Sequence, residues 1–173
     1  MQAQHFYQVI TMDQSNLLER LLALFAEHGV QYCVIGGQAV NAYVEPLVSL
    51  DLDVVIAAEQ LTEVEALLDR EFGVKRFPHS LNISAAGSDL RVQIQTDPRY
   101  LDFPQRAEVH ETLGRPLRVA GLADVLQGKI WAAQDSERRG SKRQKDLADI
   151  ARLIEAYPHL RERVPADLQA RLI

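Results

Sequence analysis

The chain has 173 residues, of which 47% are hydrophobic, so it can bury a core without disulfides or a structural metal. Its formal net charge of −5 excludes a uniformly basic nucleic-acid-binding surface and leaves only a local basic patch for contact with RNA. No stretch is long and apolar enough to span a membrane, and the first residues lack the pattern of a signal peptide. With a single cysteine, Cys33, in an apolar run, these features predict a cytoplasmic protein.

The first third of the chain has the pattern of a helix, a strand and a second helix. Apolar residues recur at helical spacing over 15–28, and a glycine follows the last of them. Residues 31–35 form a short apolar run typical of a buried strand. The pair Gly36-Gly37 then predicts a turn into a brief helix over 38–43, which a nearby proline prevents from continuing.

The middle of the chain predicts further strands around one helix. Residues 50–57 alternate as a strand does, and residues 59–71 have the apolar spacing of a helix. Strands are expected at 80–85 and 90–96, joined by a short hairpin turn. Residues 98–120 contain three prolines and are expected to form only short pieces.

The rest of the chain is expected to be helical, over 121–134, 141–156 and 165–172. This order of elements predicts an α/β or α+β fold with a C-terminal helical part. We therefore expect a core over 1–120 and a helical part over 121–173 that packs on it as one compact unit.

Two carboxylates stand on one face of the strand at 50–57. Side chains repeat every second residue in a strand, so Asp51 and Asp53 share a face, about 7 Å apart, while Leu52, Val54 and Ile56 form the core face. Their like charges repel unless a cation lies between them. Such oxygen ligands suit Mg²⁺, whereas the alternative is an exposed acidic edge of a strand.

The glycine pair before this strand has two interpretations as well. Gly36 and Gly37 follow a buried strand and open a helix, where backbone N–H groups can approach a phosphate. The simpler interpretation is a tight turn from strand to helix. A phosphate cradle facing a metal site would provide the parts that phosphoryl transfer requires.

The two motifs together resemble the signature of the DNA polymerase β-like nucleotidyltransferases. The run Val34-Ile35-Gly36-Gly37 is followed, after a spacer, by Asp51-Leu52-Asp53-Val54, and the later run from Lys145 to Ile150 is also similar to a segment common in that group. More narrowly, the pattern is similar to the minimal nucleotidyltransferases and the AbiEii-type toxins. The resemblance implies a small mixed sheet flanked by helices, Mg²⁺ at Asp51 and Asp53, and glycines that contact a nucleoside triphosphate.

The resemblance fails at the third carboxylate of the family's site. The alternation of the strand at 90–96 puts Gln93 at that position, where a glutamine can offer a carbonyl oxygen as a ligand but neither a charge nor a base. Asp89 and Asp97 share its face, but each is about 13 Å away along an extended strand. Leu47 and Ser49 stand where the family often carries a basic residue and a threonine.

Basic residues in the C-terminal helices are candidates for contacts with the nucleotide. Lys129 falls within the apolar stripe of its helix, so it either reaches solvent or points into a charged cleft, where the resemblance suggests Asp53 or a triphosphate as its partner. Arg138, Arg139 and Arg143 lack close helical partners and are candidates for binding the phosphates of a nucleotide or of RNA.

The helix that follows has an alternative interpretation as a solvated helix. Lys142 and Asp146, and likewise Lys145 and Asp149, have the (i, i+4) spacing of surface ion pairs.

Three functional hypotheses follow. The first is an enzyme that moves a nucleoside monophosphate from an NTP to a hydroxyl on a small molecule, a protein or an RNA. The second is a nucleotidyltransferase fold retained as a regulatory module, either an antitoxin-like protein partner or a nucleotide sensor, for which Gln93 is the argument. The third is an α/β domain of unrelated role, in which the motifs are incidental.

Overall fold

The computed structural model describes residues 16–172 and contains one mixed sheet of seven strands in the order β3-β4-β5-β2-β1-β7-β6. Strand β2 pairs antiparallel with β1 and parallel with β5, and β1 pairs parallel with β7. The strands are β1 (Tyr32–Ile35), β2 (Asp51–Ile56), β3 (Gly73–Phe77), β4 (Ser80–Ser84), β5 (Arg91–Gln95), β6 (Glu108–Thr112) and β7 (Arg115–Val119). The predicted mixed α/β fold is confirmed.

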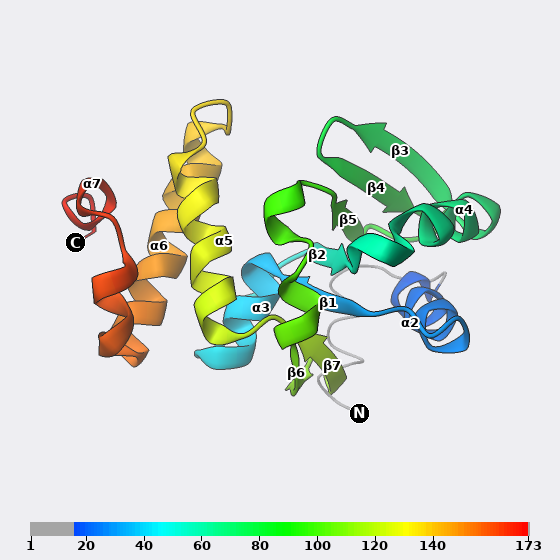
Figure 1. Ribbon diagram of the computed structural model, residues 1–173, viewed down its shortest axis with the longest axis horizontal. Helices are drawn as coiled ribbons and strands as arrows, with labels where there is room; N and C mark the ends of the chain where they lie inside the picture. The colour runs from blue at the N-terminus through cyan, green and yellow to red at the C-terminus, as the bar shows by residue number, and fades with distance from the viewer. Residues whose placement is uncertain (1–15, 173) are drawn as a thin grey trace.

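Helices lie at both ends of the view in Figure 1, with the sheet between them. Helices α5 and α6 stand side by side at one end, and α2 and α4 lie at the other, where Arg20 Nη2 donates a 3.0 Å hydrogen bond to the carbonyl of Glu71. The helices are α2 (Leu17–Glu27), α3 (Gly36–Tyr43), α4 (Leu61–Glu71), α5 (Leu122–Gln134), α6 (Gly140–Ala156) and α7 (Ala166–Gln169). Helix α3 contacts both α5 and α6, while the predicted division at residue 120 stays a prediction.

Strand β2 lies at the centre of the sheet, and its alternation is as predicted. Leu52, Val54 and Ile56 are buried in the core, and the two carboxylates face the other way. Val55 lies on the carboxylate face but is also buried, so only the first half of that face is open to a ligand.

Several predicted elements are confirmed with shifted bounds. The hairpin of β4 and β5 pairs antiparallel as expected. Helix α3 begins at Gly36 rather than at Gln38, because the glycines form its first turn. The helix predicted over 165–172 covers only Ala166–Gln169, of which Leu168 is the buried residue. The predicted start of the first helix at residue 15 lies outside the described residues.

Three strands were not predicted. Strand β3 is an edge strand whose residues are mostly exposed, so it shows no apolar alternation. Strands β6 and β7 form a hairpin within the proline-rich stretch, joined by Leu113 and Gly114, both with positive φ. Leucine is rare in that conformation, so the sequence did not predict a turn at Leu113. Pro116 is tolerated because β7 pairs with β1 only at Val119.

None of the helices within residues 16–172 is both long enough and apolar enough to cross a membrane.

Candidate functional site

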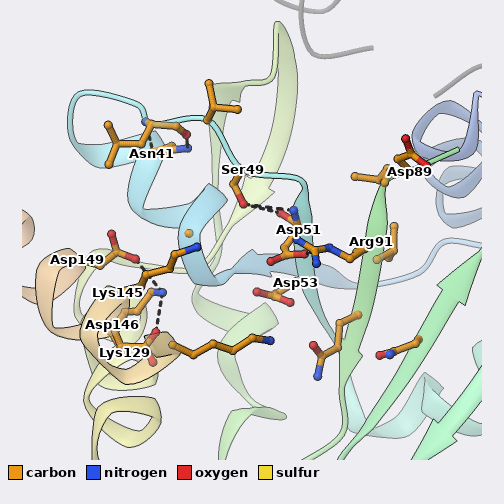
Figure 2. A pocket seen from close by; sticks show the side chains of 18 of the residues that line it. Asn41, Ser49, Asp51, Asp53, Asp89, Arg91, Lys129, Lys145, Asp146 and Asp149 are labelled. Carbon is orange, nitrogen blue, oxygen red and sulfur yellow. Dashed lines mark hydrogen bonds and ion pairs between the residues drawn. The ribbon is translucent and has the colours of Figure 1, made fainter. Parts of the chain in front are cut away.

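A cleft of about 630 Å³ lies between the sheet and the C-terminal helices (Figure 2). The sheet contributes the start of β2, the β4–β5 hairpin and the loop before β2, and the other wall comes from α5 and α6. Its charged lining residues are Asp51, Asp53, Asp89, Arg91, Lys129, Arg138, Lys142, Lys145, Asp146, Asp149 and Arg152. Most of the residues predicted to form a site therefore line one cavity.

The predicted acidic pair stands at the sheet side of this cleft. Strand β5 runs parallel to β2 in a register that places Arg91 beside Asp51 and Gln93 beside Asp53. Gln93 therefore lies on the strand next to the pair, as the alternation of its strand predicted. Arg91 Nε lies 2.6 Å from Asp51 Oδ1, so this carboxylate already has a cationic partner.

Gly36 brings the backbone against the second carboxylate. Its φ of +69° is in the left-handed region, and a Cβ built on it would overlap Asp53 Oδ2. Gly37 has no comparable restriction, because the nearest atom to its added Cβ would be Ser49 Oγ at 4.0 Å. The conformation of Gly36 and its proximity to Asp53 both require glycine at this position.

The loop before β2 is held by side-chain amides of α3. Asn41 Nδ2 donates to the Leu47 carbonyl over 2.7 Å, and its Oδ1 accepts from the Leu47 amide over 3.0 Å. The buried Gln38 donates to the Ser49 carbonyl over 3.1 Å. Ser49 Oγ in turn accepts from the amide of Asp51 over 3.2 Å, a contact drawn in Figure 2. These bonds fix the point at which the carboxylate pair enters the cleft.

Asp53 has an electrostatic environment that suits a bound cation. The pKa of its carboxyl group is raised to about 6, because burial and the neighbouring Asp51 raise it by more than Lys129 and Arg138 lower it. A divalent ion between the two carboxylates would relieve both unfavourable effects. Two carboxylates and the amide oxygen of Gln93 fit Mg²⁺, which takes one or two protein carboxylates and completes its shell with water and phosphate.

No cluster of three or more His, Cys, Asp or Glu side chains able to hold a metal occurs between residues 16 and 172. A metal in this cleft would therefore depend on the acidic pair.

Lys129 belongs to a buried ion-pair network. The residue is only 8% exposed and lines the cleft, so of the two alternatives the structure favours the charged cleft over solvent. Its Nζ lies 3.1 Å from Asp146 Oδ1 and 2.8 Å from Asp149 Oδ2. Lys129 therefore forms ion pairs with these two carboxylates and none with Asp53. Burial alone would lower the pKa of Lys129, but the two carboxylates outweigh it and raise the pKa. The network links α5 to α6 in the wall of the cleft.

The alternative interpretation of α6, with surface ion pairs along the helix, does not describe the ion pairs that Asp146 and Asp149 form. Asp146, which is 1% exposed, forms ion pairs with Lys129 and Arg138. The distance from Arg138 Nε to Asp146 Oδ2 is 2.6 Å. Lys142 and Lys145 are exposed, line the cleft and make no ion pair with the described residues. The two acidic residues turn toward α5 because they share the inner face of α6 with its apolar residues.

The predicted phosphate-binding arginines differ in their positions. Arg138 lines the cleft, although Asp146 already pairs with it. Arg139 and Arg143 do not line it.

Arg91 is a cleft residue that was missed in the sequence. The signal was present, because Arg91 is two residues before Gln93 and therefore shares its face.

No protein-family model matches the sequence, and no curated protein matches it. Solved structures are similar in fold. The antibiotic-resistance factor ANT(2'')-Ia in complex with adenylyl-2''-tobramycin superposes with a TM-score of 0.65 at 17% identity, over 92% of this chain and 99% of that one.

Two further structures superpose less closely. The lincomycin-bound lincosamide antibiotic adenylyltransferase LnuA gives a TM-score of 0.54 at 13% identity, over 83% of this chain and 99% of that one. A nucleotidyltransferase-like protein from Paracoccidioides brasiliensis gives 0.50 at 18% identity, over 94% of both chains. At these sequence identities the similarity establishes the fold alone. The resemblance drawn from the glycine and aspartate motifs is therefore confirmed as far as the fold is concerned. The chain has the nucleotidyltransferase fold.

Proposed function

We propose that this protein binds a nucleoside triphosphate with Mg²⁺ in the cleft and transfers the nucleoside monophosphate to a hydroxyl acceptor. One observation carries the proposal: Asp51 and Asp53 stand together at the start of β2, Gly36 closes against Asp53, and both carboxylates face a large cleft with basic residues on its other wall. This arrangement provides metal ligands, a close backbone approach and positive charge for a triphosphate.

Each wall of the cleft has a distinct part in this proposal. Asp51 and Asp53 would hold Mg²⁺, which when bound supplies charge neutralisation on the triphosphate. Lys142 and Lys145 are the exposed lysines opposite the acidic pair, and Arg138 lies beside them, so these side chains would bind phosphate oxygens. Lys129 acts at longer range, because its ammonium group is already engaged by two carboxylates.

The reaction itself joins the acceptor oxygen to the α-phosphorus and breaks the bond to the pyrophosphate oxygen. The hydroxyl proton must be taken up as the new bond forms. Gln93 cannot accept it, and Asp53 is a metal ligand in this proposal, so the proton would pass to solvent in the cleft.

A small hydroxyl-bearing molecule is the acceptor class best supported by the comparisons. ANT(2'')-Ia is described with an adenylylated tobramycin and LnuA as a lincosamide adenylyltransferase with lincomycin bound, so both act on small molecules. The volume of the cleft, about 630 Å³, lies within the range of small-molecule binding sites. An RNA or protein hydroxyl is the alternative acceptor.

A second function is favoured by the neutral Gln93 and by the Arg91–Asp51 ion pair. Both reduce the negative charge available to metal ions, so the cleft would bind a nucleotide without turnover. The protein would then act as a nucleotide sensor or as an antitoxin-like partner of another protein. The two proposals agree on nucleotide binding and differ on transfer.

Calorimetric titration with each of the four NTPs in Mg²⁺ tests the binding step. We expect one NTP to bind the wild-type protein, and the double variant Asp51→Asn/Asp53→Asn to lose that binding. Asp69→Asn is the matched control, because Asp69 is an exposed carboxylate on α4 outside the cleft. Equal binding by the double variant and the control would contradict the proposal.

Turnover is tested next with α-labelled NTP and pools of small-molecule and RNA acceptors. Label transferred by the wild-type protein supports the enzyme. Label transferred only by Gln93→Asp would instead identify the natural protein as a binding module.

A further inference from the structure

Arg91 occupies a position from which it can control the metal site. It stands directly opposite Asp51 in the parallel register of β5 and β2, two pairs before Gln93 and Asp53 and on the same face of the sheet. The four facing positions therefore hold two carboxylates, one guanidinium and one amide. Their formal charge of about −1 is small for a site that would gather more than one divalent ion.

The contact between Arg91 and Asp51 is close but easily broken. The Nε to Oδ1 distance is 2.6 Å, yet the Arg91 side chain is 70% exposed and that of Asp51 is 45% exposed. Ion pairs between groups so exposed contribute little to stability. A divalent ion carries twice the charge of the guanidinium and can displace it from the carboxylate.

The freed side chain would stay within the cleft, because Arg91 is one of its lining residues. A guanidinium is suited to phosphate oxygens, which it can bind through two N–H groups at once. The residue thus has two successive partners of the same charge sign, first a carboxylate and then a phosphate.

We propose that Arg91 is a tethered cation that occupies Asp51 before the metal arrives, limits the acidic pair to one divalent ion, and moves to the triphosphate when the metal–nucleotide complex binds. This inference rests on the proposed nucleotide site and makes Arg91 a positioning residue. It predicts opposite effects of one substitution on two ligands, which a merely structural role would not produce.

The test measures Mn²⁺ binding by electron paramagnetic resonance of the free ion, with and without the non-transferable analogue adenosine 5′-(α,β-methylene)triphosphate. The wild-type protein should bind one Mn²⁺ per chain. Without nucleotide, Arg91→Gln should bind that ion about three- to ten-fold more tightly, because a competing positive charge is gone. With Mn²⁺ saturating, the same variant should bind the analogue about ten-fold more weakly, because a charged phosphate contact is lost.

The matched control is Arg76→Gln, because Arg76 also pairs with carboxylates near the surface but lies outside the cleft, and this variant should change neither affinity. Equal Mn²⁺ and analogue affinities in Arg91→Gln and wild type would overturn the role of Arg91 while leaving the nucleotide site intact. Two ions per wild-type chain would overturn the one-ion limit. No Mn²⁺ or analogue binding by any folded variant would instead overturn the proposed function on which the inference rests.

Discussion

Replacing Asp53 by asparagine should stabilise the metal-free protein at high pH. The folded-state pKa of about 6 stands above the unfolded value of 3.8, so the folded protein holds this proton more tightly than the unfolded chain. The stability that this carboxyl contributes is complete below pH 3.8 and is lost as the pH rises through 6. A shift of about two pH units corresponds to about 3 kcal/mol at pH 8.

Asparagine resembles the protonated acid in size and stays neutral, so the variant escapes this loss. The free energy of unfolding of Asp53→Asn should match that of the wild type near pH 3, exceed it by about 1 kcal/mol at pH 4.5 and exceed it by about 3 kcal/mol at pH 8. Urea unfolding in EDTA at several pH values between these limits measures the difference, and contributions from groups that do not interact with Asp53 cancel between the two proteins.

Asp51→Asn is the control, because its exposed ion pair with Arg91 contributes only about 0.2–1 kcal/mol. The electrostatic account of Asp53 would be refuted by a difference between Asp53→Asn and wild type that stays constant with pH, or by a variant that is less stable at pH 8.

Other predictions concern single residues. Gly36→Ala should destabilise the protein by about 2 kcal/mol, because position 36 has a left-handed φ and an added Cβ would overlap the carboxylate of Asp53. Gly37→Ala should be neutral or stabilising by up to about 1 kcal/mol. Equal effects of the two substitutions in thermal unfolding would contradict this. Lys129→Met should lower the free energy of unfolding by about 3–5 kcal/mol, because it leaves the buried Asp146 without one of its two cationic partners. A decrease of less than about 1 kcal/mol in urea unfolding would argue against the ion-pair network. Cys33, whose pKa burial raises to about 12, should react with a thiol reagent at pH 8 only on unfolding, and rapid labelling of the native protein would show that the thiol is accessible.

Much of the site could be predicted because its signals are local. The alternation of Leu52, Val54 and Ile56 fixes which face of β2 is apolar, and the same period places Asp51 and Asp53 together on the other. The glycine pair was identified by its place between a buried strand and a helix. The sequence could not reveal that only Gly36 is constrained, because that constraint comes from Asp53, which is distant along the chain.

The partners of each charged side chain were decided by the tertiary structure. The two-residue period of a strand predicts the face on which a residue lies but not which strand is its neighbour. The pairing of Arg91 with Asp51 therefore required the parallel register of β5 and β2. Helical spacing likewise predicted surface pairs within α6, whereas packing against α5 directs Asp146 to the buried Lys129. Local periodicity by itself determined the faces and the motifs. Contacts between segments distant in the sequence decided which charges meet, because such contacts depend on how the elements pack and not on their spacing.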